Sequence, residues 1–211
     1  MSMTAVVDLA GTGATWVLYF LIALSSVQLA IILERAVVYR RARAPRTLRR
    51  DLRIALERGG SKAAAQVAAG PSLEARVIAS GAASAERGPE AAQEIMRSTL
   101  VEEKLRLERG LALLGTLGNN APFLGLFGTV LGVIHATADL STTAGHAGGQ
   151  VMAGISEALV STAVGLLVAL PAVAAYNYFT RVVKTRALAA EALGGELIAR
   201  LVAPVATRKA A

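Results

Sequence analysis

Three long runs of apolar residues dominate the pattern of this chain. Residues 9–33 form 25 consecutive positions without a charged side chain, which exceeds the ~20 residues that an α-helix needs to cross a bilayer. Residues 110–138 and 151–180 are two further apolar runs, separated by a Ser-, Thr- and Gly-rich turn at 139–150. The pattern predicts an all-α, polytopic membrane protein with three long transmembrane helices that extend into a helical cytoplasmic domain.

The segment at 34–109 is polar and rich in residues that favour helices. Breakers divide it into short helices: Pro45, Gly59–Gly60, Gly70–Pro71 and Gly88–Pro89. Ser72 is a candidate N-cap, and a long helix is expected to start near Pro89 and to run directly into the second apolar run. Leucines at helical spacing also predict that the third span continues as a helix in residues 181–211.

Charge sets the expected orientation of the spans. All 22 Lys and Arg residues lie in 35–109 or 181–209, and cytoplasmic segments carry the excess of such residues in membrane proteins. Residues 1–8 and 139–150 are therefore expected outside, with 34–109 and 181–211 in the cytoplasm. The net charge of +7 does not indicate nucleic acid, because much of the basic excess directly follows an apolar run, where lipid head groups attract it.

Glu157 is the most informative side chain in the apolar runs. A carboxylate within a span costs ~2.5–3.5 kcal/mol on insertion scales, so such a group usually faces a bundle interior or a wet cavity. Ser161, one turn further on, and Thr162 provide polar neighbours. The alternative interpretation is a Glu at the level of the lipid head groups that extends toward water.

The second span is rich in small residues. Gly125, Gly128 and Gly132 provide surfaces on which helices pack closely in lipid. Pro122 removes one backbone donor and frees the carbonyl of Gly118. Thr129 lies at membrane depth, where its hydroxyl either faces a polar path or bonds back to its own helix.

No pattern of catalytic or metal-binding residues emerges. His135 and His146 do not have convincing metal-ligand spacing, and a lone His near the end of a span is more often a packed or interfacial residue. The chain contains no cysteine, and no nucleotide-binding or nucleophile motif is present. We expect no metal, no cofactor and no enzymatic activity.

Two runs in the later spans resemble the MotA/TolQ/ExbB proton channel family. They are APFLGLFGTVLGVIHA (Ala121–Ala136) and GISEALVSTAVGLLVALPAVAAYN (Gly154–Asn177), and they occur in the family's order with a short turn between them. LERA at Leu33–Ala36 also fits, whereas residues 45–100 match only in length and helical character.

The resemblance implies a homopentamer in the bacterial inner membrane that surrounds a single-span partner of ExbD or TolR type with an intramembrane Asp. It also implies a TonB- or TolA-like protein that receives the force. The family's acidic residue falls on Glu157, its pore-lining threonines fall on Thr129 and Thr162, and its second-span proline falls on Pro122. Ser161 is a further candidate for the ion pathway.

We therefore expect a proton-channel or motor subunit that couples proton motive force to mechanical work. Two other functions remain open from the sequence. In a structural membrane scaffold, Glu157 would only fix helix packing. A subunit of a solute or polymer export system would move its solute without a single-span acidic partner.

Overall fold

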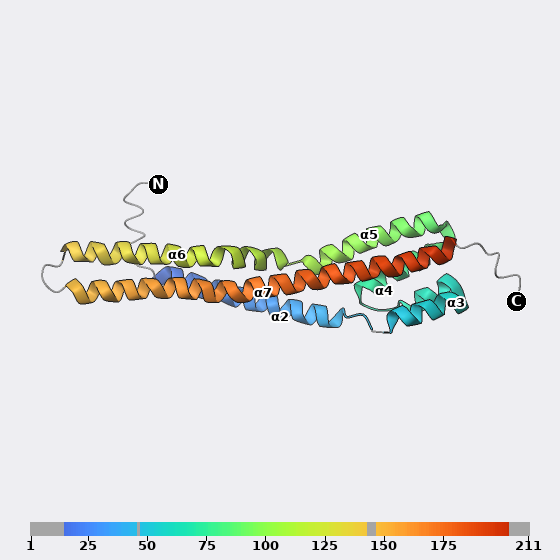
Figure 1. The fold of residues 1–211 in the computed structure, drawn as a ribbon, viewed down its shortest axis with the longest axis horizontal. Helices are drawn as coiled ribbons and strands as arrows, with labels where there is room; N and C mark the ends of the chain where they lie inside the picture. Colours follow the sequence, from blue (N-terminus) through green and yellow to red (C-terminus); the bar gives the residue numbers. More distant parts are fainter. Residues whose placement is uncertain (1–14, 46, 143–146, 203–211) are drawn as a thin grey trace, which may run out of the picture. The chain divides into compact units, whose positions relative to one another are not determined.

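The structure, a computed structural model, describes residues 15–45, 47–142 and 147–202. Within these residues the chain forms six α-helices, one short 3-10 helix and no strand, which confirms the predicted all-α class (Figure 1). The elements are α2 (Thr15–Arg41), α3 (Leu48–Val67), α4 (Leu73–Ala83), η1 (Ala85–Arg87), α5 (Pro89–Glu108), α6 (Leu111–Thr142) and α7 (Ala147–Val202).

The helices form two compact units, and α2 and α7 each contribute residues to both. The membrane unit consists of the described residues in 15–33 and 110–178, and the polar unit consists of those in 34–109 and 179–202. Three helices are long and apolar enough to cross a membrane, judged by length and composition: α2, α6 and α7. The predicted number of spans is therefore present in the described residues.

Contacts within the membrane unit give the direction of each span. The rings of Trp16 and Phe127 lie 6.2 Å apart, and near the other end of α2 the side chain of Ile31 lies against Gly110. The start of α2 thus meets the middle of α6, and the later part of α2 meets the residue just before α6, so these two helices are antiparallel. α6 and α7 are antiparallel by the same criterion, because Gly115 faces Tyr176 and Gly154 faces Ala136.

Glycines let α6 and α7 approach closely at the centre of the membrane unit. A Cβ atom built on Gly165 would lie 2.7 Å from the carbonyl oxygen of Ala121 and 2.9 Å from the Cα atom of Gly125. Only hydrogen fits in that space, so the two backbones touch. In lipid, where burial of apolar area alone drives no association, such close van der Waals packing holds helices together.

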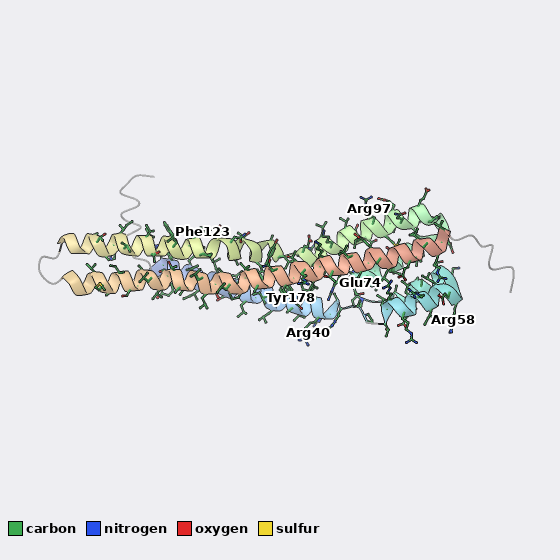
Figure 2. All side chains as sticks on the ribbon, in the orientation of Figure 1. Arg40, Arg58, Glu74, Arg97, Phe123 and Tyr178 are labelled. Carbon is green, nitrogen blue, oxygen red and sulfur yellow. The ribbon has the colours of Figure 1, made fainter. Side chains whose placement is uncertain are left out.

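The membrane unit has apolar side chains on its outer surface as well as in its core. The buried cluster contains Val17, Leu21, Ala121, Leu131, Val168 and Ala169. Phe123 and Leu167 are about two-thirds exposed, and Phe123 lies on the outer face of α6 (Figure 2). A surface of this kind suits a hydrocarbon environment or a neighbouring subunit, whereas water would disfavour it.

The helix starts predicted for the polar unit are present in the structure, whereas two other predicted features differ. Ser72 caps α4, accepting a hydrogen bond from the Ala75 amide at 3.1 Å, and α5 begins at Pro89. The break expected at Gly59–Gly60 is a kink inside α3, where Gly60 has φ 66°. The expected continuous helix from Pro89 into the second span is wrong, because α5 ends at Glu108 and Gly110 has φ 74°. Glycine adopts this left-handed conformation at little cost.

Arg186 joins two helices of the polar unit. Its guanidinium donates hydrogen bonds to the carbonyl oxygens of Tyr39 at 2.8 Å and Ala42 at 2.9 Å, which lie at the carboxyl end of α2. The last carbonyls of a helix lack partners within the helix and favour a positive charge. The ring of Tyr39 stacks on Phe179 with centroids 5.0 Å apart, and its hydroxyl donates to the Leu107 carbonyl.

The last part of α7 also packs within the polar unit. Met96 of α5 lies against Gly81 and Gly194, and Glu196 forms an ion pair with Arg49 at 2.6 Å. The leucine spacing in residues 181–211 predicted a helix, and α7 continues to Val202. At its other end α7 begins at Ala147, and α6 continues to Thr142, so both helices extend into the expected turn. His146 lies outside the described residues.

Candidate ion pathway in the membrane unit

Thr129 of α6 and Thr162 of α7 meet at the centre of the membrane unit. Their hydroxyl oxygens lie 3.2 Å apart, and both side chains are half-buried. The Thr129 hydroxyl also donates to the Leu126 carbonyl at 2.6 Å, so in this arrangement Thr162 is the donor between the two hydroxyls. The Thr129 hydroxyl therefore bonds to its own helix and also contacts a polar neighbour across the seam.

Glu157 lies on α7 five residues before Thr162, about 7.5 Å along the helix axis. Its side chain is exposed on the isolated chain, and its Oε1 atom accepts a hydrogen bond from the Thr15 hydroxyl at 2.9 Å. The contact joins the first turns of α2 to α7. It leaves the second carboxylate oxygen, Oε2, without a hydrogen bond from any described residue.

Ser161 lies on a different side of α7 from the threonine pair. It is fully buried, and a Cβ atom on Gly128 would lie 2.7 Å from its Cβ atom. Its hydroxyl oxygen has no hydrogen-bond partner among the described residues. A buried hydroxyl without a partner is unusual in folded proteins and is often satisfied by water. Consecutive residues of a helix are about 100° apart, so Ser161 and Thr162 face different neighbours.

The residues expected to support helix packing lie along α6. Gly125, Gly128 and Gly132 are all buried, and Gly125 and Gly128 both pack against α7 within the same chain. Pro122 lies inside α6 and is half-buried. The carbonyl that it frees belongs to Gly118, whose Cβ position is 2.6 Å from the Val173 side chain. This seam is therefore tight on both sides of the proline.

Sequence reasoning missed a polar groove between α6 and α7. Its free volume is about 360 Å³, and Asn119, Asn120 and Asn177 are among its lining residues. The consecutive asparagines in an apolar run were a signal that could have identified it. His135, by contrast, is half-buried on α6, and the described residues contain no group of three His, Asp or Glu side chains that could hold a metal.

Comparison with known proteins assigns a family to this arrangement. Residues 69–192, more than half of the chain, match the MotA/TolQ/ExbB proton channel family. The chain belongs to this family. The resemblance of Ala121–Ala136 and Gly154–Asn177 is thereby confirmed, and the match also includes α4 and α5, where the motifs had indicated only helical character.

Relatives in this proton channel family carry two kinds of name. The biopolymer transport protein ExbB of Neisseria gonorrhoeae is 39% identical over 106 residues, 50% of this chain and 48% of that protein. ExbB of Xanthomonas campestris pv. campestris is 41% identical over 87 residues, which are 41% of this chain and 34% of that protein. The Tol-Pal system protein TolQ of Pseudomonas aeruginosa is 44% identical over 85 residues, which are 40% of this chain and 37% of that protein. The matched region thus spans about half or less of each relative.

Proposed function

We propose that this chain is the proton-channel subunit of an energy-transducing complex in the bacterial inner membrane. In this account the complex couples proton motive force to mechanical work on a partner of TonB or TolA type. The observation that carries the proposal is the contact of Thr129 with Thr162, about one and a half turns from Glu157, in a chain of the proton channel family. The apolar spans thereby contain a hydroxyl pair and, about 7.5 Å away along α7, a carboxylate.

The three side chains have different roles in this account. Glu157 attracts cations and stabilises a transient proton beside a wall of low dielectric constant. The hydroxyls of Thr129 and Thr162 can each donate and accept a hydrogen bond, so they can hold water in line for proton transfer. Ser161 offers a further unpaired hydroxyl in the same unit.

A complete proton relay through the bilayer needs either water or a second carboxylate, and the last two spans of this chain supply only one carboxylate. Between Asp139 and Glu191, Glu157 is the one acidic residue of the sequence. We infer a single-span partner of ExbD or TolR type, which brings an intramembrane Asp, surrounded by a homopentamer of this chain. The names ExbB and TolQ among the relatives support this kind of partnership.

The inferred orientation has the amino terminus and residues 139–150 in the periplasm. The inferred segments are an outer segment at 1–8, spans at 9–33, 110–138 and 151–180, and cytoplasmic parts at 34–109 and 181–211. The alternating direction of α2, α6 and α7 and the absence of Lys and Arg outside 35–109 and 181–209 support this arrangement.

One observation favours a second candidate, a structural scaffold. The hydrogen bond from Thr15 to Glu157 could serve to hold α2 against α7. Glu157→Gln keeps an acceptor oxygen for Thr15 and removes only the charge, whereas Thr15→Val removes the hydrogen bond and keeps the charge. These two variants therefore separate the electrostatic role of Glu157 from its packing role.

The experiment reconstitutes each variant with a candidate single-span partner and measures proton flux and thermal stability. The channel account predicts that Glu157→Gln abolishes flux in a complex of normal stability, while Thr15→Val retains most of it. If Thr15→Val lowers stability and flux together and Glu157→Gln changes neither, Glu157 only fixes helix packing.

A further inference from the structure

The polar groove between α6 and α7 lies at the end of the membrane unit that is nearest in the sequence to Arg109 and Arg181. Thr116, Asn119 and Asn120 line it from α6, and Tyr176 and Asn177 line it from α7. All five residues belong to the membrane unit. The glycine at 115 lets the ring of Tyr176 approach α6, because a Cβ atom there would lie only 3.2 Å from the ring.

The groove extends well into the depth of the bilayer. Asn177 is four residues from Arg181, but Asn120 is eleven residues from Arg109, about 16 Å along a helix. The hydrocarbon core of a bilayer is about 30 Å thick. The groove therefore begins near the head groups and ends close to the middle of the span.

Two of its three side-chain amides have no hydrogen-bond partner among the described residues. The Asn120 amide donates to the Thr116 carbonyl of its own helix at 2.8 Å. The side-chain amides of Asn119 and Asn177 have no hydrogen-bond partner among the described residues, and both side chains are exposed. Unsatisfied polar groups are costly in hydrocarbon, so at this depth they face water or protein.

On α7, one residue that lines the groove shares a helix face with Thr162. Val173, which also lines the groove, is eleven residues beyond Thr162, or about three helical turns. Pro122 is seven residues before Thr129, about two turns, and therefore shares the face of Thr129. Pro122 also frees the carbonyl of Gly118, and Gly118 packs on Val173, which lines the groove.

We propose that this groove is the water-filled inner mouth of the ion pathway, through which protons pass between the threonine pair and the cytoplasm. The proposal rests on the proposed function. A free volume of about 360 Å³ holds on the order of ten water molecules at their bulk density. Asn119, Asn120 and Asn177 position this water.

The first test measures access of water to the groove and does not depend on proton flux. The native chain has no cysteine, so Asn120→Cys introduces a single thiol, and Leu113→Cys is the matched control. Leu113 is exposed on the same helix and is seven residues nearer to Arg109. If closeness to the head groups alone set the reaction rate, the thiol at position 113 would react faster than the thiol at position 120. A charged methanethiosulfonate reagent reacts with the thiolate, which forms only in water, so Asn120→Cys should react at least about tenfold faster.

The second test measures whether protons use this route. A cationic adduct at Asn120→Cys should lower proton flux of the assembled complex several-fold, and the same reagent should leave the Leu113→Cys complex unchanged. If Asn120→Cys fails to assemble, Asn177→Cys gives the same comparison. Equal reaction rates in the two variants, protection of Asn120→Cys by an assembled neighbour, or full flux after modification would each overturn the proposal.

These outcomes are distinct from failure of the proposed function. A wild-type complex that conducts no protons contradicts the channel account before any groove variant is made. If the wild-type complex conducts protons but the thiol of Asn120→Cys is unreactive, only the proposal that the groove is the inner mouth is contradicted.

Discussion

The hydroxyl oxygens of Thr129 and Thr162, which are 33 residues apart in the sequence, lie 3.2 Å from each other between α6 and α7. The contact depends on the glycines around it. A Cβ atom on Gly125 would lie 3.0 Å from the Cα atom of Thr162, so a larger residue there would separate the two helices. The small residues of the seam thus bring the two hydroxyls together as well as holding the helices.

Replacing Thr162 by Val should lower proton flux several-fold without changing assembly. Val has nearly the shape of Thr but lacks the hydroxyl, so Thr129 loses its neighbour across the seam. The effect should be smaller than that of Glu157→Gln, because water can replace one hydroxyl more readily than a charge. Thr137→Val is the control, since among the described residues the Thr137 hydroxyl bonds only to carbonyls of its own helix. A loss of flux equal in the two variants would show that the pair has no special role.

Gly165→Ala should destabilise the membrane unit. The added methyl group would lie 2.7 Å from the backbone oxygen of Ala121, and overpacking of this kind costs about 1–3 kcal/mol. The matched control is Gly195→Ala on the same helix, where nothing lies within 4 Å of the new atom. Thermal unfolding in detergent should show a lower midpoint for Gly165→Ala and an equal or higher one for Gly195→Ala. Equal midpoints would mean that α6 and α7 do not approach as described.

Arg186→Leu should destabilise the polar unit by about 1.5–3 kcal/mol, the usual contribution of hydrogen bonds to a charged group. The variant leaves the Tyr39 and Ala42 carbonyls without their donor. Lys184→Leu, two residues away at an exposed position, removes the same charge without removing such a bond. Proteolysis of the two variants under mild conditions provides the measurement. Equal protection of Arg186→Leu and Lys184→Leu would show that the hydrogen bonds of Arg186 to α2 do not stabilise the polar unit.

Impermeant thiol reagents test the inferred orientation in spheroplasts. Ser141→Cys should be labelled from outside, and Ser61→Cys should be labelled only after lysis, because every Lys and Arg lies on the side of Ser61. The reverse pattern would invert the orientation of all three spans.

Much of the fold follows from the sequence because the bilayer imposes a strict length on apolar helices. Local signals at Ser72 and Pro89 also gave the starts of α4 and α5. The break at Gly110 was not expected, because a glycine inside a helical pattern is compatible with either a helix or a left-handed turn until the packing around it is known.

The candidate site was predictable to a smaller extent. The motifs indicated Glu157, Thr129 and Thr162, but contacts between helices depend on their register. The bond from Thr15 to Glu157 joins residues 142 positions apart. Likewise, Asn120 and Asn177 line one groove only because the glycine seam aligns α6 and α7 at that level.

The measurement that most directly tests the central claim is proton flux through the reconstituted complex carrying Glu157→Gln, with oligomer and partner content determined in parallel. The substitution preserves the shape of the side chain and an acceptor for the Thr15 hydroxyl, and it removes the negative charge. The account predicts a complex of normal composition whose flux is abolished, with part of the flux retained in Glu157→Asp. A Glu157→Gln complex of normal composition that conducts protons at the wild-type rate would contradict it.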